Sequence, residues 1–233
     1  MAVLKKELGK IAEVVVSAPR ENQSGAAHSG RFEGRVERLE KDWQFFGYGV
    51  YGRPADAVRF GILELGKDNP FDLVVSGINR GANVGLVSHL SRTVGAAMET
   101  QYLGLPSIAV SQDVSGVDTE NSAIFTANLV KKYQRDGAPE GTVISINIPA
   151  GEIMGVAARP MGDSYIHFQG FRETGREGNI IEYEMDRNIV SADDPESDTH
   201  AYQQGYITLT PLKFDWTDRE MIQQIESWNL VTP

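Results

Sequence analysis

Short apolar runs alternate with amphipathic segments along this chain of 233 residues. The runs at 14–16, 73–75 and 108–110 are too short for helices and are typical of strands buried in a parallel sheet. Between them, apolar residues recur at helical spacing, as in 53–65. The alternation predicts an α/β fold in which a Rossmann-like, mostly parallel sheet carries helices on both faces.

Turn and capping residues refine the boundaries of the predicted elements. Pro54 is expected in the first turn of one helix, and Ser122 is expected to cap another. Asp56 is expected either to complement the dipole of a first helical turn or to anchor a loop. The predicted helices lie at 2–9, 53–65, 91–99, 122–133 and 218–228, the strands at 13–18, 73–75, 106–110, 142–147 and 205–210, and a β-excursion at 32–39 and 43–51.

The character of the chain changes near its two-thirds point. We assign residues 1–150 to the Rossmann-like core and 151–233 to a β-arm followed by a final strand and helix. The arm, at 164–168 and 180–185, has too little local core to stand alone, so we expect it to pack on another subunit. The acidic run at 193–198 suits either a metal site or a solvated loop, and its consecutive carboxylates with Pro195 favour the loop.

Composition narrows the class of protein. Hydrophobic content of 41% and charged content of 23% are those of a globular domain, and no run reaches the roughly 18 apolar residues of a membrane span. The net charge of −10 argues against a surface that coats nucleic-acid polymers. The sequence has no cysteine, and its first residues lack a signal-peptide core. We therefore expect a cytoplasmic protein with no membrane partner.

The stretch 71–103 organises the rest of the chain. A buried strand leads into a glycine-rich loop at 77–85, and Ser91 and Thr93 then open a helix of small residues. Glycines allow close backbone approach and a helix start offers free N–H groups, so this pattern suits an anion such as phosphate. Asn79 and Asn83 add amide oxygens for a hard cation. The alternative is an ordinary strand-to-helix turn, in which the asparagines serve only left-handed geometry.

Two segments before this stretch bear on the same site. The polar segment 20–29 leaves the predicted strand 13–18 at its carboxyl end, where α/β sheets bind ligands, although its composition alone favours a surface loop. The helix at 2–9 lies where a doubly wound fold has a helix that follows a central strand, and no strand precedes it in the printed sequence. Without that strand, we expect two unpaired strand edges or a new pairing.

Taken in order, these segments resemble the SurE family, the survival-protein-E 5′/3′-nucleotidases. The most specific block is Ser-Gly-Ile-Asn-Arg-Gly at 76–81, followed by Asn83 and Gly85. Further matching blocks are Ala18-Pro19 with Asn22-Gln23-Ser24-Gly25 and His28-Ser29, then Pro54-Ala55-Asp56, 93–99, 106–109, 147–150 and 205–212.

The resemblance implies a metal-dependent phosphatase that acts on nucleoside monophosphates and forms a homodimer or homotetramer through the C-terminal arm. Its divalent metal, Mg²⁺ or Mn²⁺, would be held by two adjacent aspartates, a serine and an asparagine, and the last two map to Ser24 and Asn79. The implied catalytic residues are Ser91, Thr93, His28 and Arg80, and the implied phosphate-binding residues are Gly25, Asn83 and Arg92.

The printed sequence departs from the family pattern at the metal aspartates. The family carries an Asn-Asp-Asp-Gly motif on the strand before the first helix, and this sequence starts inside that helix. We favour a truncated chain or a misassigned start, because loss of a central strand should be strongly destabilising. The alternative is a relative that binds a nucleotide or phosphate without phosphatase activity. Arg53 and Arg92 also replace the usual Thr and Gly, and Arg92 either adds a phosphate contact or blocks close backbone approach.

Overall fold

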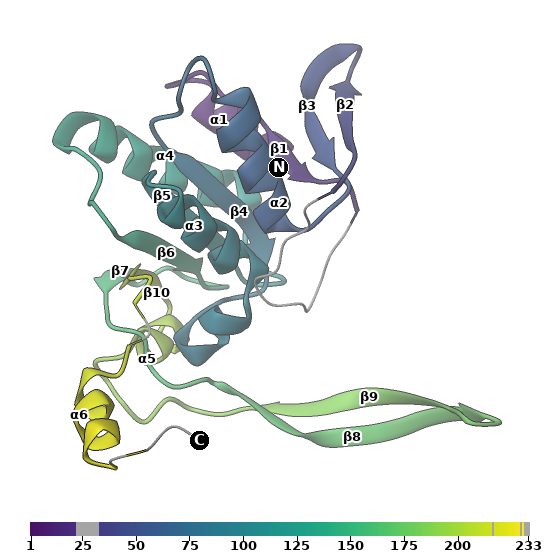
Figure 1. The fold of residues 1–233 in the computed structure, drawn as a ribbon, viewed down its shortest axis with the longest axis vertical. Coiled ribbons are helices and arrows are strands. Elements are labelled where there is room, and N and C mark those ends of the chain that lie inside the picture. The colour runs from purple at the N-terminus through teal and green to yellow at the C-terminus, as the bar shows by residue number, and fades with distance from the viewer. Residues whose placement is uncertain (22–32, 216, 229, 231–233) are drawn as a thin grey trace.

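The structure is a computed structural model, and it describes residues 1–21, 33–215, 217–228 and 230. Its centre is a five-stranded sheet in the order β4-β5-β6-β10-β7 (Figure 1). The strands are β4 (Val74–Arg80), β5 (Ser107–Gln112), β6 (Val143–Ile148), β7 (Gly155–Ala158) and β10 (Tyr206–Leu212). β4, β5 and β6 are parallel, whereas β10 runs antiparallel to β6 and parallel to β7. The predicted mostly parallel sheet is therefore confirmed.

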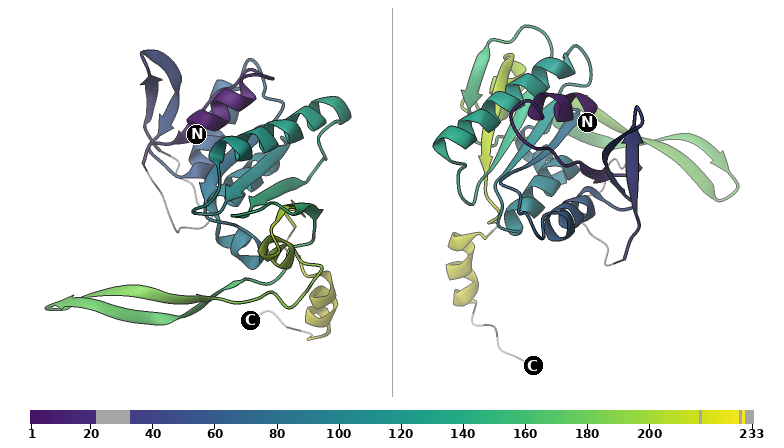
Figure 2. Two further views of the ribbon diagram at one scale, coloured as in Figure 1. Left: turned by 180° about the vertical axis from the view of Figure 1, so that it is seen from behind. Right: turned by 90° about the horizontal axis from the view of Figure 1, so that it is seen from above.

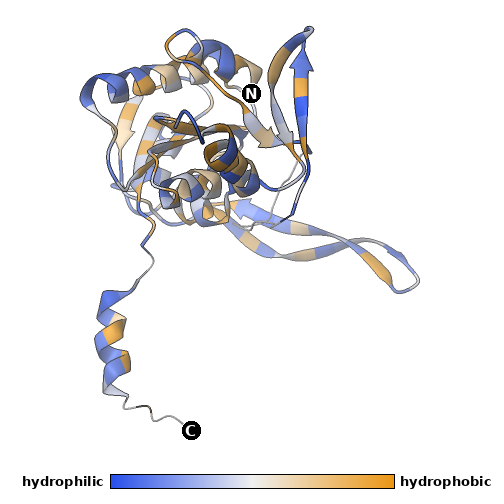
Figure 3. Ribbon diagram, turned by 45° about the horizontal axis from the view of Figure 1, so that its top comes forward, coloured by the Kyte–Doolittle hydropathy of each residue, from blue (hydrophilic) through white to orange (hydrophobic). Residues whose placement is uncertain are grey.

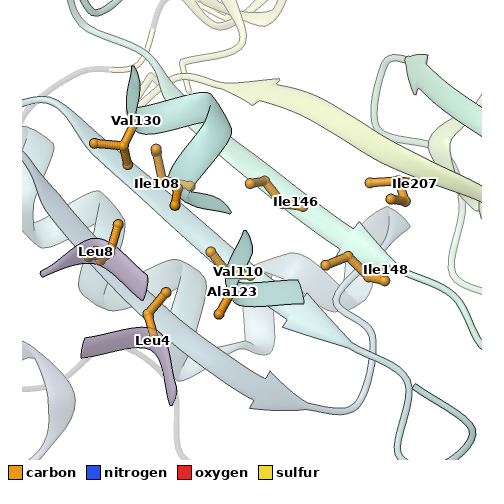
Figure 4. Packing of buried hydrophobic residues seen from close by; sticks show 10 residues of the cluster. Leu4, Leu8, Ile108, Val110, Ala123, Val130, Ile146, Ile148 and Ile207 are labelled. Atoms are coloured by element: carbon orange, nitrogen blue, oxygen red, sulfur yellow. The ribbon is translucent and has the colours of Figure 1, made fainter. Parts of the chain in front are cut away.

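Helices cover both faces of this sheet. On one face, α1 (Ala2–Leu8) and α4 (Thr119–Asp136) bury Leu4, Leu8 and Val130 against Ile108 and Ile146, as Figure 4 shows. On the other face, α3 (Arg92–Tyr102) packs its small residues Val94 and Ala97 against Ala109 and Val143. Successive residues of β5 thus serve opposite faces, as the two-residue period of a strand requires. This explains why the sequence shows continuous apolar runs.

A second, smaller sheet lies beside the first. It has the order β1-β3-β2, with β1 (Ser17–Pro19), β2 (Val36–Lys41) and β3 (Gln44–Val50), and β1 pairs in parallel with β3. β1 and β4 are each the edge strand of their own sheet, so these two groups of strands form separate sheets. The expected outcome, two strand edges without a partner between them, is confirmed for the described part of the chain.

The helix after β3 begins as its residues predict. α2 (Pro54–Phe60) has Pro54 in its first turn, and the backbone N–H of Arg53 donates to Asp56 Oδ2 at 2.8 Å. Asp56 therefore caps the start of this helix. The helix continues as a π-helical turn at Gly61–Leu65. The prediction that Ser122 caps α4 is wrong, because Asp118 does so by accepting from the N–H of Glu120 at 2.9 Å.

The C-terminal part contains a long arm and a detached helix. β8 (Ile166–Glu177) and β9 (Ile180–Ile189) form a two-stranded hairpin that projects from the body, and α6 (Arg219–Ser227) lies apart from it (Figures 1 and 2). Apolar and polar residues alternate along both elements (Figure 3). β7 and β10 nevertheless belong to the central sheet, so the proposed boundary at residue 150 divides that sheet. No helix of the described residues has the length and apolar character to cross a membrane.

Candidate functional site

The parallel strands of the central sheet end together, and polar side chains gather there. The register pairs Arg80 with Gln112, and Gln112 with Ile148. One step earlier it pairs Asn79 with Ser111, and Ser111 with Asn147. Because all three strands run the same way, their carboxyl ends form one edge, which is where open α/β sheets bind ligands.

The glycine-rich loop over this edge is shorter than the sequence predicts. β4 runs through Arg80, so Gly77 to Arg80 belong to the strand, and the loop proper is 81–84. Gly77 has φ +140°, and a Cβ at this position would collide with the carbonyl oxygen of Val110. The glycine therefore allows β4 and β5 to remain in contact at an irregular step of the register.

Asn83 holds the middle of the loop to the strands beneath it. Its N–H donates to Asn147 Oδ1 at 2.7 Å, and its side-chain amide donates to Ser111 Oγ at 2.6 Å. Its carbonyl oxygen accepts from Ser88 Oγ at 2.6 Å. Asn83, Ser111, Ser88 and Asn147 are all buried. In this structure the Asn83 side chain supports the loop from below, and its predicted phosphate contact stays a prediction.

The loop leads into the predicted anion-binding helix. After a 3₁₀ turn, η2 (Gly85–Leu90), Ser91 caps α3 by accepting from the N–H of Val94 at 3.2 Å, so the predicted helix start is confirmed. Thr93 and Arg92 lie half-buried in its first turn. The first N–H groups of a helix lack intrahelical acceptors and carry the positive end of its dipole, so this turn can bind an anion.

Two charged residues lie at the ends of neighbouring strands, Arg80 at the end of β4 and Asp113 after β5. The sequence analysis missed Asp113. The guanidinium of Arg80 is exposed and donates to the carbonyl oxygen of Val114 at 3.0 Å. Asp113 follows β5 directly and accepts from the Tyr202 hydroxyl at 3.0 Å. Burial raises the pKa of Tyr202 far above its usual value, and the Asp113 carboxylate raises it further. The Tyr202 hydroxyl therefore keeps its proton, donates a hydrogen bond to Asp113 and is no candidate for a base.

These features can be compared with known proteins. The family model described as survival protein SurE matches residues 1–167. The chain belongs to the SurE family. It is similar to the protein named 5′-nucleotidase SurE of Petrotoga mobilis, with 36% identity over 97% of this chain and 92% of the relative. It is also similar to the 5′-nucleotidase SurE of Syntrophobacter fumaroxidans, with 35% identity over 94% of this chain and 89% of the relative.

A solved structure gives the same result for the fold. The chain is similar to the crystal structure of the SurE protein from Aquifex aeolicus, with a TM-score of 0.84 and 30% identity. The similarity covers 98% of this chain and 94% of that chain. The family resemblance inferred from the Ser-Gly-Ile-Asn-Arg-Gly block at 76–81 is confirmed, and so is the fold class.

The described residues supply only part of the metal site that the SurE resemblance implies. The side-chain nitrogen of Asn79 donates to the carbonyl oxygen of Gly81 at 2.7 Å, so its amide oxygen is the atom left to meet a cation. Mg²⁺ takes about six oxygen ligands, usually with carboxylates among them. Among the described residues, no group of three or more Asp, Glu or His side chains is arranged to hold a metal. Asn79 fits as one ligand, but these residues do not by themselves fit the ion.

Three of the predicted site residues, Ser24, Gly25 and His28, lie outside the described residues. The structure brings Asn79, Arg80 and Asn83 together at the end of β4 and places Ser91 and Thr93 on the helix that follows. It also reveals two buried supports that the sequence analysis missed, Asn147 and Asp198. Asn147 had a signal, because a polar residue near the end of an apolar strand points to this edge of the sheet. Asp198 was assigned to a solvated loop, and this is wrong, since its side chain is buried.

Proposed function

We propose that this chain has the chemistry of a nucleotidase and hydrolyses nucleoside monophosphates to nucleoside and phosphate. The observation that carries the proposal is the anchored loop 81–84 with the N-terminus of α3 after it, at the carboxyl ends of β4, β5 and β6. Relatives that cover nearly the whole chain are named 5′-nucleotidases, which supports the phosphate monoester as the substrate class.

The substrate phosphate is proposed to lie against the first turn of α3. Its backbone N–H groups and the Thr93 hydroxyl can stabilise the charge that develops on the phosphoryl oxygens. Because Ser91 already accepts from the N–H of Val94, its hydroxyl hydrogen remains available as a donor toward the phosphate. Arg80, which is exposed at the end of β4, is proposed as a further phosphate contact, and Arg92 as another.

A divalent metal, Mg²⁺ or Mn²⁺, is part of this proposal, with Asn79 as one ligand. The amide oxygen of Asn79 is of the type that hard cations bind, but a neutral oxygen alone holds such an ion poorly. Carboxylates in addition to Asn79 are therefore required, as the family's pair of adjacent aspartates would provide. Three further roles are proposed as before: Ser24 is a metal ligand, Gly25 a phosphate contact and His28 a proton-transfer residue.

One observation favours a second function. The described residues contain no acidic cluster at this edge of the sheet that could hold the metal. A chain that keeps the loop and the helix N-terminus without these carboxylates would bind a nucleotide or phosphate without turning it over. Both functions require binding of the phosphate group, but only the nucleotidase then hydrolyses the nucleotide.

The metal requirement can be tested on a protein that carries this chain preceded by an apolar strand ending in Asp-Asp. We expect phosphate release from nucleoside monophosphates with Mn²⁺, and none with excess chelator. Asn79→Ala should raise the Mn²⁺ concentration needed for half-maximal activity by at least about tenfold, because it removes a ligand. Asn121→Ala, on the exposed side of α4, is the matched control. Unchanged Mn²⁺ dependence in Asn79→Ala would remove Asn79 from the site.

The arm is proposed to join subunits into a homodimer or homotetramer. One of its faces exposes a group of apolar side chains beside Glu173: Phe171 pairs with Met185, and the ring centroids of Phe171 and Tyr183 lie 4.8 Å apart. These side chains are 67%, 48% and 62% exposed. The other face carries an ion pair between Arg172 and Glu184 at 2.7 Å. A two-stranded hairpin that exposes apolar side chains has marginal stability in water. A second copy of the chain would cover these side chains.

A further inference from the structure

Asp198 is a buried carboxylate that accepts hydrogen bonds from three separate parts of the chain. It is 1% exposed and is the first residue of α5 (Asp198–Gln203). Both of its oxygens lie 3.2 Å from the N–H of Gly85. Oδ1 also accepts from the N–H of Gly162 at 2.9 Å, and Oδ2 accepts from the Thr210 hydroxyl at 3.0 Å.

The donors to Asp198 are neutral. They are the backbone N–H groups of Gly85 and Gly162 and the Thr210 hydroxyl. A buried charge is costly, and several hydrogen bonds to the charged form offset that cost only when their geometry is fixed. The buried Asp198 carboxylate is therefore stable only while its donors stay in place. The same hydrogen bonds fix the positions of those donors.

The groups that Asp198 joins belong to the loop, to the segments on either side of the arm and to the central sheet. Gly85 directly follows the loop 81–84 and begins the turn that leads to Ser91. Gly162 lies in the segment that enters the arm at β8, and Asp198 lies in the segment that leaves the arm after β9. Thr210 belongs to β10 in the central sheet. We call the segments that enter β8 and leave β9 the roots of the arm. The Asp198 side chain thus connects the loop, both roots of the arm and the central sheet.

The loop end is shaped for this contact. Gly85 has φ +61°, and a Cβ there would overlap the carbonyl oxygen of Asp163 and the hydroxyl of Thr199. The Thr199 hydroxyl in turn donates to the Asp163 carbonyl oxygen at 2.8 Å. The backbone at Gly85 therefore lies directly against the root of the arm, and little displacement of one is possible without the other.

We propose that Asp198 is a positioning residue that fixes the end of the glycine-rich loop, and with it the start of α3, to the roots of the arm. Through this carboxylate, the placement of the arm sets the placement of the groups that receive the substrate phosphate. The role of this coupling in catalysis rests on the proposed function, whereas the coupling itself does not.

Hydrogen–deuterium exchange tests the coupling on the whole chain. In Asp198→Asn we expect exchange to rise at least about tenfold in peptides covering 82–90 and 158–165 together, with little change in β5. Thr210→Val removes one donor at nearly constant volume and should raise exchange in the same two segments by a smaller factor. Asp194→Asn, an exposed neighbour, is the control. Unchanged exchange, or an equal rise in β5, in both Asp198→Asn and Thr210→Val would overturn the proposal.

Kinetics separates positioning from a merely structural role. In the form of the protein that releases phosphate, Asp198→Asn should lower kcat by about tenfold to a hundredfold while KM changes little, because small displacements of positioned groups cost rate. Val130→Ala, a buried change in α4 on the far side of the sheet, serves as a control of comparable stability loss. If both variants lose the same activity, Asp198 has only a structural role. If no form releases phosphate, the proposed function fails while the exchange result still decides the coupling.

Discussion

Asn83 and Asn147 exchange two hydrogen bonds across the end of the central sheet. The N–H of Asn83 donates to Asn147 Oδ1 at 2.7 Å, and Asn147 Nδ2 donates back to the carbonyl oxygen of Asn83 at 3.2 Å. A side chain of β6 thus pairs with the loop backbone as a neighbouring strand would. The buried N–H and C=O of the loop are satisfied in this way, as buried backbone groups require.

Removal of this side chain should destabilise the fold. Asn147→Ala leaves the buried N–H of Asn83 without its acceptor and opens a small cavity, so we expect a loss of about 2–4 kcal/mol in the free energy of unfolding. Urea denaturation of the variant against wild type measures this, with the exposed Asn121→Ala as control. A loss below about 0.5 kcal/mol would show that the loop does not depend on Asn147.

The ion pair between α2 and α3 offers a second test. Arg59 Nε lies 2.6 Å from Glu99 Oε1, and the Glu99 side chain is 2% exposed. Arg59→Met should cost about 2 kcal/mol, because it removes the cation from a buried carboxylate, although Arg59 itself is partly screened by solvent. Adding Glu99→Leu to that variant should recover part of the loss in thermal or urea unfolding. A double variant as unstable as the sum of the two single changes would contradict this reading of the pair.

Tyr133 gives a prediction about alkaline pH. Its hydroxyl is buried without a hydrogen-bond partner in the described part of the chain, and burial raises its pKa to about 12. Between pH 10 and 12 the unfolded tyrosine loses its proton while the folded one keeps it, so wild-type stability falls as pH rises. Tyr133→Phe removes this loss and an unsatisfied group, and should be about 1 kcal/mol more stable at pH 8.

The measurement for Tyr133→Phe is the difference in unfolding free energy from wild type at pH 8 and at pH 11. We expect the advantage of the variant to grow over this interval. Tyr102→Phe, at an exposed position, is the control. A constant or shrinking advantage would mean that the Tyr133 hydroxyl is solvated in the folded protein.

A charge introduced among the exposed apolar side chains of the arm tests whether the arm joins subunits. Phe171→Glu should shift the protein toward smaller species in light scattering coupled to gel filtration, because a carboxylate in a covered apolar contact carries a desolvation cost. Glu184→Gln, on the opposite face, is the control and should leave the mass unchanged. An unchanged oligomer in Phe171→Glu would exclude this face as a subunit contact.

The sequence predicted the elements where local chemistry decides them. Pro54 and Ser91 start helices because a fixed φ and a side-chain acceptor act within one turn. The apolar runs located β5 and β6 because those strands are buried on both faces, and they located β4 although this edge strand is only half-buried. The Ser122 prediction failed because Asp118, one turn earlier, is also a capping residue, and nothing in the local pattern ranks the two.

The supports of the site could not be predicted in the same way, since they depend on contacts distant in sequence. Asp198 is bound to Gly85, more than a hundred positions earlier, so its acidic neighbours at 193–196 dominated the local pattern. The extent of β4 was missed because Gly77 usually marks a loop, whereas here it allows close contact with Val110. In both cases tertiary packing overrides local composition.

The measurement that tests the central claim most directly is phosphate release from a nucleoside monophosphate with Mn²⁺. It compares the chain as printed with the same chain preceded by an apolar strand ending in Asp-Asp, which would lie between the edge strands β1 and β4. We predict release by the extended protein, lost on chelation, and a rate at least about a hundredfold lower for the printed chain, because carboxylates supply most of the attraction for the metal. If neither protein releases phosphate while both are folded, the nucleotidase function is contradicted; equal rates would contradict the requirement for the added carboxylates.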